Sequence, residues 1–169
     1  MSYIMDNEVQ LVESTEPYER MDLITHEESG DTQRIVLHTK QDEGNPMLEL
    51  EHHLWSKNKP ILLWKLIVKN SSKKTVQDLK GYVIMDCDIG GPRSFKDDFG
   101  AFDGKSSSLM LWDDNSLFVR MSARPEPSGW EIAPPLKLKV IGDRRDLRNN
   151  EEVGPQDIAG ALQWDLGDL

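Results

Sequence analysis

The chain has little of several things that would place it in a specialised class. It contains one cysteine, Cys87, so no internal disulfide can form. Its longest apolar run, Ile61–Val68, is interrupted by Lys65 and is far too short to span a bilayer. The first ten residues carry Asp6 and Glu8 in place of the apolar run of a signal peptide. We therefore expect a cytoplasmic protein with no membrane partner.

Positive charge is also scarce, because 20 lysines and arginines stand against 30 acidic residues, for a net charge of -10. Proteins that bind phosphate backbones cluster their basic residues and release counterions on contact. Here the basic pairs Lys57/Lys59, Lys73/Lys74 and Arg144/Arg145 are scattered among more numerous acids. We therefore expect no nucleic-acid partner.

What the chain does have is a period of two in its apolar residues, which is typical of half-buried strands. Leu62–Lys69 carries Trp64 on an apolar face and two lysines on the other, and Met47–Trp55 alternates in the same way. We assign the Trp64 face to the core. Further strands are expected at Val9–Glu13, Arg20–Thr25, Arg34–Thr39, Lys80–Asp86, Leu109–Trp112, Leu117–Ala123, Leu136–Ile141 and Ile158–Leu166.

Turn residues separate these strands, and no window shows a helical apolar period. Asp113–Ser116 is expected to close a hairpin, and Pro134–Pro135 prevents strand pairing before Leu136. A chain of 169 residues can bury about 70% of its unfolded surface. The sequence therefore predicts an all-β fold, an antiparallel β-sandwich with little helix, as a single domain over residues 1–169 with residues 1–8 flexible.

An acidic stretch is the first candidate site. Calcium takes six to eight oxygen ligands, and carboxylates beside glycine turns can supply them. The spacing does not match an EF-hand loop, so solvated loop acids are the alternative. Beyond a possible calcium ion no cofactor is expected. The candidate ligands are Asp86, Asp88, Asp97, Asp98 and Asp103.

The histidines offer a second candidate site. His52 and His53 are adjacent on one strand and must point to opposite faces. His38 and His52 would meet if their strands paired, with Glu49 or Glu51 nearby. Ordinary strand histidines are the alternative. The thiol of Cys87 lies between two aspartates, which favours a structural role over nucleophilic chemistry.

Trp130 is the third candidate, because it lies in a loop between prolines and is the best placed of the five tryptophans to form an exposed platform. Aromatic platforms stack on sugars or grip peptides. Anchoring of the loop against a sheet edge is the alternative.

Three segments resemble a known family: Val68–Leu79, Met85–Gly91 and Ala161–Leu169. The chain is similar to the galactose-mutarotase-like super-sandwich domains, and most of all to those preceding the catalytic domain of glucoamylase-type glycoside hydrolases. The resemblance implies a sandwich fold and a link to carbohydrate. The helical catalytic domain and its paired acids are absent, so no catalytic residue carries over. In such domains the closing Leu-Gly-Asp-Leu runs into another strand, which indicates a small relative or a fragment with a truncated C-terminus.

These observations predict a non-catalytic β-sandwich module that binds a carbohydrate or a protein partner. The alternative is a small sugar-isomerase-like or metal-dependent enzyme that uses the strand histidines and carboxylates. We also expect a homodimer, because sandwiches leave edge strands and Ile61–Val68 has the composition of an unprotected edge.

Overall fold

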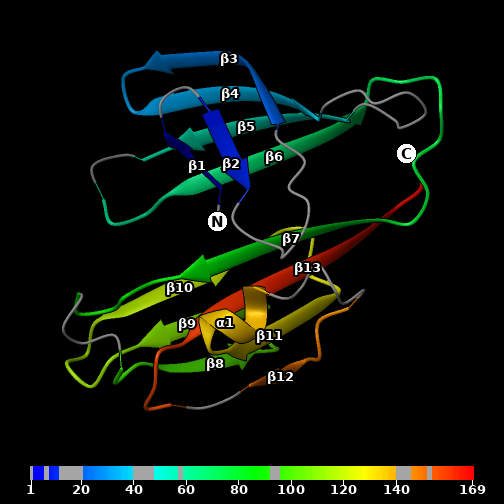
Figure 1. Ribbon diagram of the computed structural model, residues 1–169. Helices are drawn as coiled ribbons and strands as arrows, with labels where there is room; N and C mark the ends of the chain where they lie inside the picture. The colour runs from blue at the N-terminus through cyan, green and yellow to red at the C-terminus, as the bar shows by residue number, and fades with distance from the viewer. Residues whose placement is uncertain are drawn as a thin grey trace. The chain divides into compact units, whose positions relative to one another are not determined.

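A computed structural model describes residues 2–5, 8–11, 21–39, 48–56, 59–91, 96–139, 146–151 and 154–169. Over these residues the chain is all-β with one short helix, which confirms the predicted fold class. The chain divides into two compact units (Figure 1). The six-stranded unit extends to Asp78 and includes Asp168–Leu169, and the sandwich unit is Leu79–Gly167. No helix in the described residues has the length and apolar character needed to cross a bilayer.

The six-stranded unit is one antiparallel sheet in which each strand pairs with the next along the chain. Gly30, which has a positive φ, lies in the turn that joins β3 to β4. The pairings of β4 with β5 and of β5 with β6 are in unbroken register. A bulge between Leu23 and Thr25 interrupts the pairing of β3 with β4. The strands are β1 (Ser2–Met5), β2 (Glu8–Leu11), β3 (Met21–Ser29), β4 (Thr32–Thr39), β5 (Leu48–Trp55) and β6 (Leu63–Asn70).

The sandwich unit has two sheets that pack face to face. One has the order β10-β9-β8 and the other the order β12-β11-β13-β7 (Figure 1). Among the described strands of this unit, only β12 and β11 pair in parallel. The predicted Asp113–Ser116 hairpin is confirmed as the β9–β10 connection. The strands are β7 (Leu79–Asp86), β8 (Phe99–Asp103), β9 (Ser108–Trp112), β10 (Phe118–Ser122), β11 (Gly129–Ala133), β12 (Asn150–Glu151) and β13 (Ala159–Gly167).

The core of the sandwich unit lies between these two sheets. Two glycines let the layers approach closely, because a Cβ on Gly160 would collide with the Leu109 side chain and one on Gly100 would lie 2.7 Å from Cγ2 of Ile132. Burial of such apolar surface is the main force that holds the layers together. The fully buried members of this core are Leu109, Leu111, Ile132, Ile158 and Leu162, with Ile89 beside them.

The strand predicted at Leu136–Ile141 is wrong where the structure describes it. Pro135–Lys139 forms the short helix α1 instead. Proline suits the first helical position, since its φ is preset and its missing N–H has no partner there. The backbone N–H groups of Lys137 and Leu138 donate to the carbonyl of Pro134, and the Leu138 side chain is fully buried.

Candidate functional site

Strand β6 is an edge of its sheet, because β5 pairs with one side of it and no described strand pairs with the other. Its eight residues contain no proline, glycine or bulge, and all eight pair with β5 in unbroken register. Proteins usually protect long, regular edge strands with charges, proline or bulges. Apart from Lys65 and Lys69, β6 has none of these protections, and its outward backbone donors and acceptors pair with no described strand.

The edge also carries an exposed apolar surface, which we call the β6 strip: Ile61, Leu62, Leu63, Trp64 and Leu66. Leu62 is 65% exposed and Trp64 is 41% exposed, so the assignment of the Trp64 face to the core is wrong. The alternation was read correctly, but in an edge strand even the apolar face remains partly open. Trp64 and Leu66 share one face of β6 and Leu63 lies on the other, so the strip exposes apolar side chains on both faces of this edge. Exposed apolar patches mark interaction surfaces.

The apolar face continues from β6 across the sheet. In the observed register Leu54 lies opposite Trp64, and His52 lies opposite Leu66. Farther in, Leu50 is paired with Leu37, which is only 3% exposed. Exposure therefore rises from the middle of the sheet toward the β6 edge.

The opposite face of the same strands is charged and internally paired. Glu51 accepts hydrogen bonds from Arg34 Nε at 2.7 Å, His53 Nε2 at 3.0 Å and Lys69 Nζ at 3.0 Å. The hydrogen bonds from Arg34 and then Lys69 lower the pKa of Glu51 to about 2. Lys69 also donates to Glu49 at 2.7 Å. This network satisfies its own charges, which is typical of a structural face.

An open depression of about 490 Å³ lies on and around this charged face. Arg34, His53, Trp55 and Lys65 contribute to its lining. Enclosed, mostly apolar pockets are typical of small-molecule sites. An open depression is a poor container for a substrate, so it does not define an active site. Its full lining is Glu27, Ser29, Thr32, Gln33, Arg34, His53, Leu54, Trp55 and Lys65.

The histidines of the predicted ligand pair do not share a site. Their strands do pair, but His38 lies opposite Glu49 and His52 lies opposite Ile35, so the two rings occupy opposite faces of the sheet. His38 Nε2 contacts Glu49 Oε2 at 3.1 Å. His52 and His53 point to opposite faces, as predicted.

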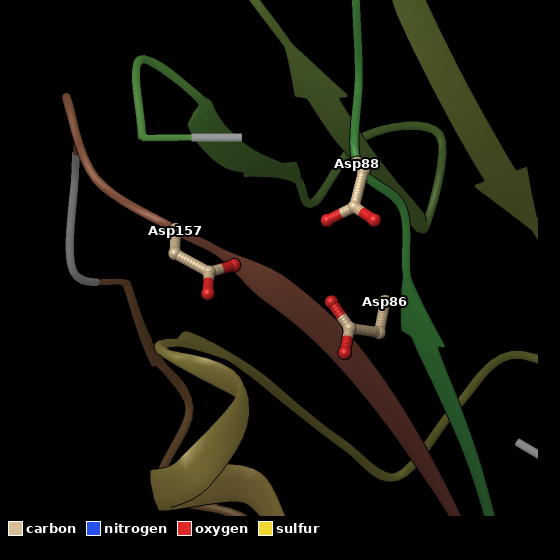
Figure 2. A group of neighbouring side chains, drawn as sticks. All are labelled: Asp86, Asp88 and Asp157. Atoms are coloured by element: carbon tan, nitrogen blue, oxygen red, sulfur yellow. The ribbon is translucent and has the colours of Figure 1, made fainter. Parts of the chain in front are cut away.

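The acidic stretch converges in the sandwich unit, although with a different membership from the one predicted. One carboxylate oxygen each from Asp86, Asp88 and Asp157 lie within 4.8 Å of one another. Asp86 ends β7, Asp88 follows it, and Asp157 precedes β13, so neighbouring strand ends place the three carboxylates in a common space (Figure 2). The sequence linked the first two, and Asp157 was missed because it is 69 residues away from Asp88.

Asp98 is not a member of that trio, and it is almost completely buried, with 1% exposure. Neither of its carboxylate oxygens has a hydrogen-bond partner among the described residues. Burial raises the pKa of Asp98 to about 6, and the charges of Asp97, Asp113 and Asp157 add to the effect. The N–H of Ile89 offsets part of this shift without completing a hydrogen bond. A buried carboxyl of this kind is costly when ionised.

The other two predicted ligands are not among the converging carboxylates. Asp97 precedes Asp98, and its carboxylate is outside the trio. Asp103 ends β8, and its carboxylate accepts hydrogen bonds from the β8–β9 turn, from the Ser106 hydroxyl at 2.5 Å and the Lys105 N–H at 3.0 Å. The hydrogen bond from Ser106 lowers the pKa of Asp103. Asp103 is therefore a turn-forming residue.

Trp130 lies in β11, and one face of its indole is occupied. The ring stacks on Phe102 with centroids 4.5 Å apart and an interplanar angle of 11°, and it packs against the sandwich core. The prediction that Trp130 lies in a loop is wrong, because Trp130 belongs to β11 and pairs with Leu162 of β13. Cys87 is half-buried beside the same core, and burial, with the neighbouring charge of Asp86, raises the pKa of its thiol. A raised pKa leaves little of the reactive thiolate.

Comparison with models of known protein families gave no match, and neither curated proteins nor solved structures matched the chain.

Proposed function

We propose that this chain is a non-catalytic protein-interaction module whose contact surface is the β6 strip. The observation that supports it is the coincidence of two features in one segment. The residues from Ile61 to Leu66 are apolar except for Lys65, and they lie on or beside a sheet edge that pairs with no described strand. A sheet edge offers backbone hydrogen bonds, and alternate side chains offer apolar contacts, so together they suit another polypeptide.

A protein partner fits this surface better than a sugar does. Sugar sites combine an aromatic face with several converging polar groups. Trp64 supplies an aromatic face, but its indole N–H already donates to His52 and its neighbours on the strip are leucines. Trp130 has one ring face covered by Phe102. The carbohydrate link implied by the family resemblance stays a prediction without a supporting site.

The enzyme alternative lacks the convergence that catalysis requires. A general base and its partners must reach one reacting atom within hydrogen-bond distance. His38 and His52 lie on opposite faces of the sheet. The carboxylate of Glu51 is ion-paired with both Arg34 and Lys69. The geometry of these residues therefore favours binding over catalysis.

Site-specific photo-crosslinking tests the proposal. A benzophenone amino acid placed at Leu62, which is 65% exposed, is expected to form discrete adducts when the full chain is irradiated in its source cells. The matched control is the same group at Leu136, which is 77% exposed but lies on α1 in the sandwich unit. Adducts from position 62 and none from position 136 would support the proposal. Equal labelling from both positions, or none from position 62, would overturn it.

A further inference from the structure

We propose that the partner of β6 is β6 of a second copy of this chain, paired antiparallel about a two-fold axis at Leu66. The inference rests on the proposed function, because it names the partner of the same surface. Backbone N–H and C=O groups on alternate residues of an edge strand point away from its sheet. In β6 such groups recur along all eight residues without a break. The Asn70 side chain donates to the carbonyl of Leu169, and no other described hydrogen bond joins the chain's end to this strand.

Charge does not prevent self-pairing at this strand, in spite of the net charge of -10. β6 contains no acidic residue and two lysines, Lys65 and Lys69. Lys69 is already paired, since its ammonium binds Glu49 at 2.7 Å and Glu51 at 3.0 Å. The edge therefore lacks the concentrated negative charge found elsewhere on the chain. Lys65 has no ion-pair partner among the described residues, so its position opposite a second copy matters most.

The lysines select the register. With the axis at Leu66, Trp64 lies opposite Val68, Lys65 lies opposite Ile67, and Leu63 lies opposite Lys69 of the second copy. A move of the axis to Lys65 would place that lysine opposite itself. A move to Ile67 would place Lys65 opposite Lys69. Like charges directly opposite each other destabilise an antiparallel pair.

The same register joins the two apolar faces. Residues paired across an antiparallel ladder share a face, so Trp64, Leu66 and Val68 of one copy lie beside those of the other. The two leucines at position 66 meet on the axis, where each has 39% exposure in the single chain. A continuous apolar face then crosses the junction between the sheets. An isologous contact of this kind closes on itself as a dimer.

Sedimentation of the full chain tests the assembly. The unmodified protein is expected to dimerise, and Leu66→Lys, which sets two new charges on the axis, is expected to weaken dimerisation at least tenfold. Phe118→Lys is the matched control, because Phe118 is 71% exposed on β10 of the sandwich unit. A chain that is monomeric at high micromolar concentration would overturn the inference. So would a folded Leu66→Lys variant that dimerises as well as the unmodified protein.

Cysteine crosslinking tests the register independently of that variant's folding. Only residue 66 lies opposite itself, so Leu66→Cys should form a disulfide-linked dimer on mild oxidation, since Cα atoms facing each other in a ladder are within disulfide range. Ile67→Cys, which retains the same native Cys87, should not. Efficient crosslinking at position 67 and none at position 66 would overturn the register.

The crosslinking at Leu62 separates the two proposals. An adduct with twice the mass of the chain supports the second copy as the partner. A discrete adduct with a different protein would overturn the self-pairing and leave the interaction module in place.

Discussion

The indole of Trp64 lies parallel to the imidazole of His52, with centroids 5.6 Å apart and an interplanar angle of 8°, and its Nε1–H donates to His52 Nδ1 at 3.1 Å. Because Nδ1 accepts this bond, the neutral ring carries its proton on Nε2. That Nε2 is buried and has no partner among the described residues. The stacking and the hydrogen bond fix the orientation of the His52 ring beside Trp64 of the β6 strip.

His52 should titrate below the usual histidine range. Burial lowers its pKa from 6.5, so the folded chain binds the proton less readily than the unfolded chain. The contribution of His52 to stability is complete above pH 6.5 and is lost as pH falls from 6.5 through the lowered pKa. An NMR titration of the ring protons should show a midpoint below 6.5. A midpoint at or above that value would contradict the buried, neutral ring.

His52→Phe should flatten the pH dependence of stability between pH 7 and pH 5. The variant keeps an aromatic ring against Trp64 and removes both the titrating group and its unpartnered Nε2. Denaturation midpoints measured at the two pH values check this. An unchanged difference between them would show that His52 does not contribute to acid sensitivity.

Trp64→Ala should cost little stability for so large a truncation. The side chain is 41% exposed, so its loss removes one stacked pair and one hydrogen bond and leaves no closed cavity. We expect a cost of about 1–2 kcal/mol. Leu109→Ala, at a position with no exposure, should cost about 2–5 kcal/mol. Denaturation followed by circular dichroism gives the free energy of unfolding of both variants. A larger loss for Trp64→Ala than for Leu109→Ala would show that Trp64 is a core residue.

The sequence predicted the strands well because their signal is local. Alternation located β4, β5 and β6 to within two residues, and turn chemistry located the β9–β10 hairpin. Burial was harder to predict than the strands themselves. An apolar alternation such as that of β6 looks the same whether the strand lies at the centre or at the edge of a sheet. That position depends on which strands pair, and pairing is a property of the whole fold.

The features that the sequence did not predict also depend on pairing and packing between distant segments. β8 contains Gly100 and ends at Asp103, both residues that are depleted in strands, yet the glycine is required where Ile132 of the facing sheet approaches. The acidic trio needed Asp157, which reaches Asp86 and Asp88 only because the start of β13 pairs with the end of β7. Contacts between distant segments leave no mark in local sequence.

Gly160→Ala should destabilise the sandwich unit. A Cβ at this position would collide with the Leu109 side chain, so the two layers would have to separate or Leu109 would have to leave its rotamer. Overpacking of this kind costs about 1–3 kcal/mol. The matched control is Gly104→Ala, where a Cβ would meet nothing within 4 Å. Thermal denaturation gives the melting temperatures of the two variants. Equal values would show that the two sheets accommodate the added Cβ at position 160 without loss of stability.

Asp98→Asn should stabilise the chain at pH 8 and lose that effect as pH falls toward 4. The folded pKa, raised to about 6, lies above the unfolded value of 3.8, so ionisation of Asp98 opposes folding and its cost grows as pH rises between them. We expect a gain of about 1–2 kcal/mol at pH 8. Asp103→Asn should act with the opposite sign, because hydrogen bonds lower the pKa of Asp103. Urea midpoints at pH 8 and pH 4 compare the variants, and a destabilised Asp98→Asn at pH 8 would contradict the prediction.

Calcium binding, predicted from the acidic stretch, now has a defined set of ligands to test. If a cation joins the carboxylates of Asp86, Asp88 and Asp157, calcium should raise the melting temperature by mass action and more than magnesium does at equal ionic strength. Asp88→Asn and Asp157→Asn should each abolish the calcium gain. Asp103→Asn should retain it, since that carboxylate is used in the β8–β9 turn. Equal melting temperatures in chelator, magnesium and calcium would eliminate the ion site. Loss of the calcium-dependent increase in Asp103→Asn would instead support the ligand set predicted from the sequence, which includes Asp103.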